Sequence, residues 1–175
     1  MNRIALRNAR PRKPIRMVLV LLATAAVQAS LLAVSPPASA APLFTGHIYE
    51  TSGRYRVGAP SLDLYKSVVE TRDGRVIEIV DAGGGYRKLR FQADTTKCVA
   101  ASDSDKYVVV HLCDGNGVDW TIVHLDSNPF PNGHYNFQNR EFNNKFLAGA
   151  NDGTRFHLKT QDQAGWYYNF SLNTA

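Results

Sequence analysis

A segment that ends in tryptophan occurs twice in the chain, and this internal repeat constrains the fold more than any other feature. The first copy is Val110–Trp120 and the second is Phe156–Trp166. Each copy has an apolar residue, His-Leu, seven mostly polar or small residues and then Trp, and the two tryptophans lie 46 residues apart. Self-similarity at a period of about 20 to 50 residues indicates a fold built from copies of one structural unit.

Each unit is expected to contain four strands. Short runs rich in Val, Ile, Leu, Phe and Tyr alternate partly with polar residues, and Gly, Asp, Asn or Pro interrupts them at the spacing typical of all-β domains. No segment after residue 41 has a convincing helical period. The expected strands are 46–50, 54–59, 62–65 and 75–80 in the first unit, 86–92, 98–101, 107–112 and 120–125 in the second, and 134–139, 145–150, 154–158 and 166–172 in the third.

The first 40 residues are typical of an export signal. Six basic residues precede an apolar run at 17–34, and Ala38-Ser39-Ala40 supplies the small residues that a signal peptidase needs. Cleavage before Ala41 would leave one domain, 41–175, with units at about 44–82, 83–130 and 131–173. A retained membrane anchor is the alternative, because the apolar run is close to the shortest length that spans a bilayer.

Removal of this segment changes the charge of the protein. The whole chain has 20 basic and 15 acidic residues, but residues 1–40 hold six of the basic ones, so the mature chain has 14 basic and 15 acidic residues. Binding to nucleic acid depends on clustered Lys and Arg, and the sequence after residue 41 has no such cluster. We therefore expect a secreted monomer that binds neither nucleic acid nor, after signal removal, a membrane.

The two cysteines, Cys98 and Cys113, are predicted to form a disulfide. Exported proteins meet an oxidising environment, in which pairing is the default. The expected strands also place Cys98 at the start, and Cys113 at the end, of one hairpin. Two free buried thiols are the alternative.

Three units of four strands, with an apolar residue at the start of each second strand and a bulky residue at the start of each fourth, resemble the β-trefoil fold. This resemblance covers about residues 44–173 and implies an all-β domain in which a six-stranded barrel is capped by three hairpins. Residues 144–153, followed by Phe156-His-Leu and by the segment 166–170, are similar to the fascin-like repeat. The cysteine pair that brackets a hairpin resembles the ricin-type lectin branch of the same fold.

The resemblance to ricin-type lectins does not extend to their sugar pocket. Their Gln-x-Trp motif is absent, since Val118 and Ala164 stand two residues before the tryptophans. The positions that would hold and stack a sugar are also changed; they are Ala100 and Cys113 in the second unit, and Ala148 and Lys159 in the third. Because Trp120 and Trp166 recur once per unit, we expect them in the core.

The sequence has no motif for catalysis, metal binding or a cofactor. His111 and His157 occupy equivalent strand positions between apolar neighbours, so we expect both to face outward or to lie at a rim. The other histidines lack the spacing of zinc sites, and no nucleophile motif is present. The carboxylates of Asp103 and Asp105 are expected to be solvated turn residues.

These observations favour a binding protein over an enzyme, with an extracellular carbohydrate or polymer as the expected partner. A protein partner is the alternative, because the loop 126–133, stiffened by Pro129 and Pro131, could insert into the active site of a secreted protease. The candidate contact residues are the polar groups before each tryptophan and one tyrosine after the second: Asp114, Asn116, Asp119, Gln161, Asp162, Gln163 and Tyr167.

Overall fold

A computed structural model describes residues 41–51, 54–102, 104, 106–142, 145–163 and 167–175. The described residues form strands, turns and loops, and none of them is helical. Their strands are β1 (Phe44–Glu50), β2 (Arg56–Gly58), β3 (Val69–Thr71), β4 (Ile77–Gly83), β5 (Tyr86–Phe91), β6 (Lys97–Ala101), β7 (Val108–Leu112), β8 (Asp119–His124), β9 (His134–Asn139), β10 (Phe146–Ala148), β11 (His157–Lys159) and β12 (Phe170–Thr174).

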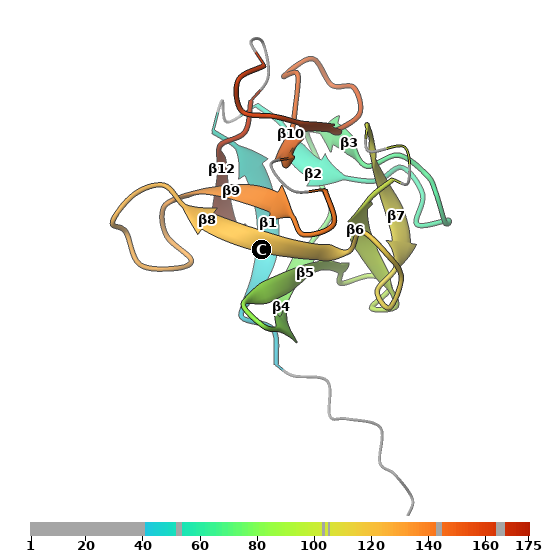
Figure 1. Cartoon of the computed structure of the whole chain (residues 1–175), viewed down its shortest axis with the longest axis horizontal. Coiled ribbons are helices and arrows are strands. Elements are labelled where there is room, and N and C mark those ends of the chain that lie inside the picture. Colours follow the sequence, from blue (N-terminus) through green and yellow to red (C-terminus); the bar gives the residue numbers. More distant parts are fainter. Residues whose placement is uncertain (1–40, 52–53, 103, 105, 143–144, 164–166) are drawn as a thin grey trace, which may run out of the picture. The chain divides into compact units, whose positions relative to one another are not determined.

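Six of these strands close into a barrel (Figure 1). The antiparallel pairs run from β1 to β4, β5, β8, β9 and β12, and β12 then pairs with β1 through Gly46 and Thr174. In the closed barrel each of the six strands pairs with a neighbour on both sides, and this pairing removes a common route to aggregation. The predictions of an all-β fold and of a six-stranded barrel are confirmed.

The remaining strands form three hairpins, each attached to one barrel strand. β2 and β3 pair next to β1, β6 and β7 next to β5, and β10 and β11 next to β9. Isolated bridges join the hairpins to one another, between Ser67 and Val109, Val69 and Arg155, and Tyr107 and His157. The hairpins therefore form one cap, in which segments distant in sequence become neighbours.

One apolar core fills the barrel and extends under the hairpins. The alternation of buried and partly exposed residues along β1 is what a strand with one buried face requires. Phe137 and Phe170 pack edge to face with ring centroids 5.5 Å apart, and Phe156 from the cap lies 6.0 Å from the Phe170 ring. Trp120 is fully buried in this core, as predicted, and its indole Nε1 donates to the Val99 carbonyl at 2.9 Å.

The prediction of a strand at residues 62–65 is wrong. The strand that follows β2 is β3, at Val69–Thr71, and it places Glu70 opposite Val57 of β2. The Asp63 N–H instead donates to the Ser61 hydroxyl at 3.1 Å in a local turn, and Tyr65 has a φ of 63°, a left-handed conformation that does not fit a strand. The prediction rested on the apolar residues of this segment, but Leu64 and Tyr65 are exposed and do not form the buried face of a strand.

Several predicted features lie outside the described residues. They are the export signal at 1–40, the acidic residues Asp103 and Asp105, and Trp166. Within the part of the chain that the structure describes, no helix has the length and apolarity needed to cross a membrane. The division into three units of about 45 residues stays a prediction.

Candidate functional site

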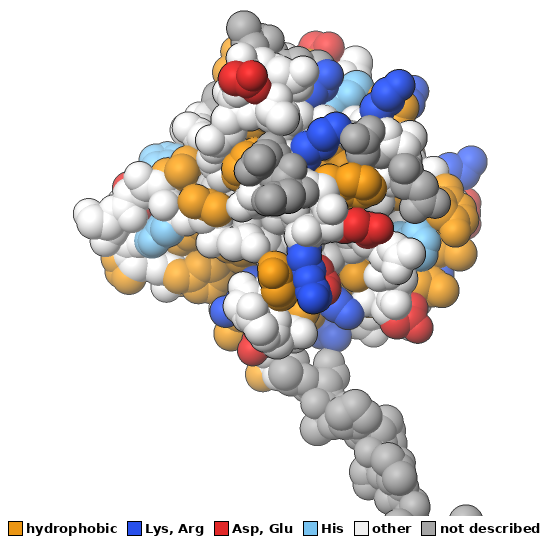
Figure 2. Space-filling view, viewed as in Figure 1, with side chains coloured by type: hydrophobic (Ala, Val, Ile, Leu, Met, Phe, Trp, Pro, Cys, Tyr) orange, Lys and Arg blue, Asp and Glu red, His pale blue; other side chains and the backbone are white. Residues whose placement is uncertain are grey.

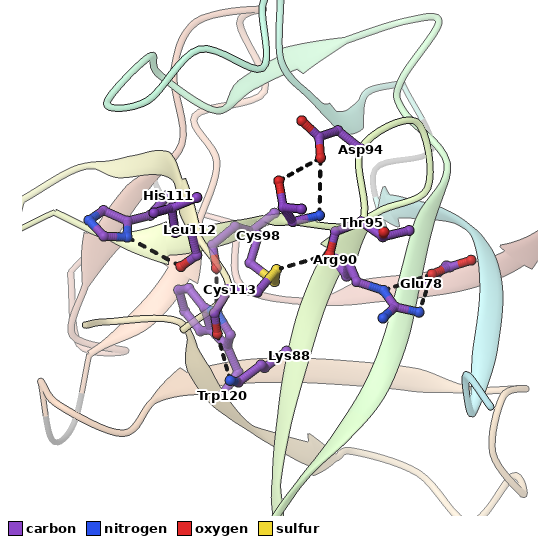
Figure 3. Close-up of a disulfide and its surroundings, with 12 residues drawn as sticks. Glu78, Lys88, Arg90, Asp94, Thr95, Cys98, His111, Leu112, Cys113 and Trp120 are labelled. Carbon is purple, nitrogen blue, oxygen red and sulfur yellow. Dashed lines mark hydrogen bonds and ion pairs between the residues drawn. A yellow bond between two sulfur atoms is a disulfide. The ribbon is translucent and has the colours of Figure 1, made fainter. Parts of the chain in front are cut away.

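A disulfide fixes the start of the loop that carries three of the candidate contact residues. Cys98 and Cys113 are joined, with their Cα atoms 5.0 Å apart, so the predicted pairing is confirmed. Figure 3 shows the bridge beside Trp120, with the Lys88 ammonium directed at the Cys113 carbonyl at 2.6 Å. The Cys113 N–H also donates to the Thr96 carbonyl at 2.9 Å. The disulfide and these two hydrogen bonds therefore fix the position of Cys113, where the β7–β8 loop begins.

Gly117 brings this loop against the neighbouring hairpin. Its φ is +70°, and its carbonyl accepts the Ala101 N–H at 2.9 Å. A Cβ on Gly117 would lie 2.6 Å from the Ala101 carbonyl oxygen, so the position requires glycine. Val118, which follows, is buried against Cys98, Ala100 and Val109 in a small second core cluster.

Asn139 joins this loop to a second one. Its side chain is buried, and its amide nitrogen donates to the Gly117 carbonyl at 2.8 Å. Its amide oxygen accepts the N–H groups of Glu141 at 3.1 Å and of Phe142 at 3.3 Å. One side chain thus orients the end of the β7–β8 loop and the start of the β9–β10 loop.

An open hollow of about 300 Å³ lies between these two loops. Its walls offer hydrogen-bond acceptors in the carboxylates of Asp119 and Glu141, and donors in the Arg140 guanidinium and the Asn116 amide. Asn116 and Asp119 are two of the residues predicted from the sequence. The lining residues are Gly115, Asn116, Gly117, Val118, Asp119, Arg140 and Glu141.

Asp119 and Arg140 form the charged part of the hollow. Arg140 Nη1 lies 3.0 Å from Asp119 Oδ2, and its backbone N–H donates to the Asp119 carbonyl at 3.0 Å. The guanidinium also lies over the Tyr86 ring, 4.4 Å from its centroid. A cation held by a carboxylate and an aromatic face loses less conformational freedom when it binds a ligand.

The second oxygen of Asp119 is unusual. Oδ1 is buried and has no hydrogen-bond partner among the described residues. An unsatisfied buried oxygen costs about 1–3 kcal/mol, and a native structure seldom tolerates one without a reason. Local costs of this kind are found at functional sites more often than elsewhere.

The other predicted contact residues do not line this hollow. Asp114 is exposed on the same loop, while Gln161, Asp162 and Tyr167 are exposed near β11 and β12. Gln163 lines a separate hollow with His157. The structure therefore divides the predicted residues between two places on the surface.

His111 and His157 are both partly buried, which agrees with the prediction that they face outward or lie at a rim. His111 Nδ1 is 3.2 Å from the Leu112 carbonyl. Burial lowers the pKa of His157, and the neighbouring charges of Lys159 and Arg155 lower it further. In the described part of the chain, no three His, Cys, Asp or Glu side chains come together in a way that could hold a metal ion.

Sequence reasoning missed Asn139, Arg140 and Glu141. The candidate contact residues predicted from the sequence lie around the two tryptophans, whereas Asn139 ends β9 and Arg140 and Glu141 follow it. The pairing of Trp120 in β8 with Asn139 in β9 brings them to the hollow. The run of polar residues from Gln138 to Glu141, at the end of the strand 134–139 and just after it, is the sequence signal for these groups.

Comparison with known proteins supports the fold through structure alone. No protein-family model and no curated protein matches the sequence. A solved structure of cytolethal distending toxin from Actinobacillus actinomycetemcomitans is similar at 12% identity, with a TM-score of 0.62, over 75% of this chain and 91% of that chain. The fold is β-trefoil-like.

Two further neighbours are much longer than this chain. A mosquitocidal holotoxin is similar at 14% identity, with a TM-score of 0.59, over 74% of this chain but 17% of its own length. Lysenin, solved in complex with phosphocholine, is similar at 12% identity, with a TM-score of 0.58, over 77% of this chain and 45% of its own length. At these identities the likeness is one of fold.

Proposed function

We propose that this chain is an exported, non-catalytic binding module, and that the hollow between the β7–β8 and β9–β10 loops binds hydroxyl groups of an extracellular carbohydrate or polymer. The observation that carries the proposal is the side-by-side placement of Asp119 and Arg140. A sugar hydroxyl donates one hydrogen bond and accepts others, so a carboxylate beside a guanidinium matches it.

The rest of the hollow supports the same class of ligand. Asn116 and Glu141 add an amide and a second carboxylate to the charged pair, and these polar groups lie beside apolar parts of the wall. An open site with both polar and apolar wall groups suits a saccharide, which presents hydroxyl groups and apolar C–H faces. The Asn139 side chain is hydrogen-bonded to the backbone of Gly117 in one loop and of Glu141 in the other. These bonds fix the two loops relative to each other, so the site is formed before the ligand arrives.

The structural neighbours support a binding role at a coarse level. Two of the three are toxins by name, and in the holotoxin the matched part is a small share of a longer chain. The export signal, the mature start at Ala41, the extracellular location and the monomeric state belong to this proposal.

A protease-inhibitor role is the second candidate, and the loop 126–133 favours it. Figure 1 shows the connection between β8 and β9 reaching out at the left of the barrel. The Asp126 carboxylate braces this loop by accepting the N–H groups of Asn128 at 3.1 Å and of His134 at 3.0 Å. Inhibitors of this type gain affinity from a loop that is rigid before binding.

The test is a glycan and polysaccharide array run beside a panel of secreted proteases, with the mature protein 41–175. We expect binding to one or more neutral saccharides and no protease inhibition. Arg140→Gln should weaken saccharide binding roughly tenfold or more, because a hydrogen bond to a charged group is worth about 1.5–3 kcal/mol. Inhibition of a protease without any saccharide binding would replace the first candidate with the second.

A matched control is available in Arg87, which forms an ion pair of the same kind with Asp81 at 2.7 Å but lines a different hollow. Arg87→Gln removes the same charge and should leave saccharide binding unchanged. Equal losses in Arg87→Gln and Arg140→Gln would contradict the assignment of the hollow.

A further inference from the structure

A second hollow lies in the cap, where three segments of the chain meet. It has a volume of about 330 Å³. Its lining residues are Lys106, Tyr107, Lys145, His157, Leu158, Lys159, Thr160 and Gln163. The first two precede β7, Lys145 precedes β10, and the others belong to β11 and the loop that follows it.

The backbone fixes these segments relative to one another. The Leu158 N–H donates to the Lys106 carbonyl at 3.0 Å, and Tyr107 forms a bridge with His157. Phe146, the neighbour of Lys145, pairs with Lys159 in the β10–β11 hairpin. The loop after β11 is closed by the Tyr168 hydroxyl, which donates to the Thr160 carbonyl at 2.5 Å. The three lysines are therefore held around the hollow by the fold.

Three lysines contribute positive charge to this hollow. Lys106, Lys145 and Lys159 line it, and none of the described residues that line it is acidic. The mature chain carries 14 basic and 15 acidic residues, so the concentration of positive charge here is local. Figure 2 shows Lys and Arg side chains gathered, with a histidine, over the upper right of the molecule. The sequence has no cluster of basic residues after residue 41, and the fold creates one.

An anion that enters the hollow is attracted by the lysine charges that line it. Each ammonium group offers three donors, and unlike a guanidinium it does not require a planar ligand. Thr160 and Gln163 add neutral hydrogen-bonding groups next to the lysines, and the Tyr107 ring adds an apolar surface. This combination fits a sugar residue that carries an anionic substituent.

We infer that the hollow formed by Lys106, Lys145 and Lys159 binds the acidic group, a carboxylate or a sulfate ester, of an anionic polysaccharide. Three lysines around one hollow match a single anionic group with its sugar ring. Nucleic acid would need an array of basic residues along the backbone, which a mature chain of this charge lacks. This site is separate from the Asp119–Arg140 hollow, and the inference holds even if that hollow binds no sugar.

The experiment compares three polymers of matched length: polygalacturonate, dextran sulfate and neutral dextran. Binding to the mature protein is measured by calorimetry at low and at physiological salt. We expect at least one of the acidic polymers to bind and neutral dextran not to bind through this hollow. Lys106→Gln and Lys159→Gln should each weaken binding by roughly tenfold, the loss that one charge-assisted hydrogen bond accounts for.

Lys97→Gln is the matched control, since Lys97 lies at the opposite end of the β6–β7 hairpin, paired with Leu112. It removes the same charge and should leave binding unchanged. Equal weakening by Lys97→Gln and Lys159→Gln would show non-specific attraction and overturn the inference, as would failure of both acidic polymers to bind. Tighter binding of a single-stranded DNA of matched charge would assign the hollow to another class of polymer.

Two readouts locate the bound anion. The pKa of the His157 imidazole, followed by NMR, should rise when dextran sulfate binds, because the anion stabilises the protonated ring. Arg140→Gln should leave acidic-polymer binding intact, which separates a failure of this inference from a failure of the proposed function. A bound acidic polymer that leaves the His157 pKa unchanged would place the anion elsewhere and overturn the assignment.

Discussion

Glu70 connects two distant parts of the cap through one buried carboxylate. Its oxygens accept four consecutive backbone N–H groups, those of Ala150, Asn151 at 3.0 Å, Asp152 at 2.8 Å and Gly153 at 2.9 Å. Successive N–H groups in a turn with positive φ form a concave anion site, and here the protein fills that site with its own side chain. The turn 150–153 is therefore held in place by a residue 80 positions earlier in the chain.

We predict that Glu70→Gln destabilises the protein by about 3 kcal/mol. The amide keeps the size of the side chain, but it replaces one acceptor oxygen with a donor that faces other donors. Urea unfolding of the two proteins measures the difference. Glu141→Gln, at an exposed position, serves as the control and should change stability by less than about 0.5 kcal/mol. Equal midpoints for Glu70→Gln and the wild type would disprove the structural role of this carboxylate.

The burial of Trp120 leads to a second prediction. Trp120→Ala removes a fully buried ring and its hydrogen bond to Val99, and it should lower stability by about 3–5 kcal/mol. The melting temperature would fall sharply, or the protein would fail to be secreted. Asp114→Ala is the exposed control, and we expect it to change stability by under about 1 kcal/mol. A stable Trp120→Ala protein that has lost its ligand would place Trp120 in the binding surface.

The lowered pKa of His157 makes stability depend on pH. Burial is the largest cause, and Lys159 and Arg155 add to it, whereas Asp152 and Glu70 act in the opposite direction. Because the unfolded chain binds a proton at a higher pH than the folded one, stability should fall as pH drops below the ordinary value of 6.5 toward the lowered pKa.

His157→Gln removes the group that gains this proton on unfolding, so the loss of stability below pH 6.5 should become smaller. Thermal melts from neutral to mildly acidic pH measure the slope. His111→Gln, at the equivalent position on β7, is the comparison. An unchanged slope in His157→Gln would mean that other groups cause the acid sensitivity.

Among the elements, the β6–β7 hairpin combines a disulfide with a small apolar cluster. Cys98, Ala100, Val109 and Val118 pack together, and Cys113 lies against them. The bridge closes a short loop, so its reduction should cost about 3 kcal/mol in the chain-entropy model. Alkylation of the native protein before and after reduction tests the pairing, and labelling of both thiols without reductant would contradict it.

A strand can be predicted from the sequence when the residues that define it are close together along the chain. The strand 134–139 was predicted at its observed bounds, because alternating residues between a Gly turn and an Asn-Arg turn define it locally. β12 begins at Phe170 rather than at residue 166, since its length depends on pairing with β1 and β9. The prediction puts β3 at the wrong residues. Its pairing with β2 and the hydrogen bonds from the distant turn 150–153 to Glu70 leave no signal in the local sequence.

The same distinction applies to the candidate site. The sequence repeat points to Asn116 and Asp119, whereas Arg140 and the three lysines of the second hollow reach their sites through contacts between segments that are distant in sequence. A single sequence shows which residues are close along the chain but not which distant segments touch in the fold. The residues that complete each hollow from a distant segment can therefore be identified only from the structure.

For the whole molecule, the pairing of β12 with both β1 and β9 closes the barrel. We predict that deletion of residues 170–175 prevents folding rather than trimming an end, because it exposes the edges of two barrel strands and removes the buried Phe170 and Leu172. Circular dichroism and protease resistance of the truncated protein measure this. A truncated protein that melts cooperatively near the wild-type temperature would contradict the prediction.

The meeting of β1 and β12 also sets the order in which this protein can be made. β1 is the first and β12 the last of the described strands in chain order, so β1 is synthesised long before the strand that pairs with it. Folding dominated by contacts between the two ends is slow, and it cannot be completed one segment at a time. Until Phe170–Thr174 pairs with β1 and β9, one edge of each of those strands lacks its barrel partner and stays accessible to proteases and chaperones.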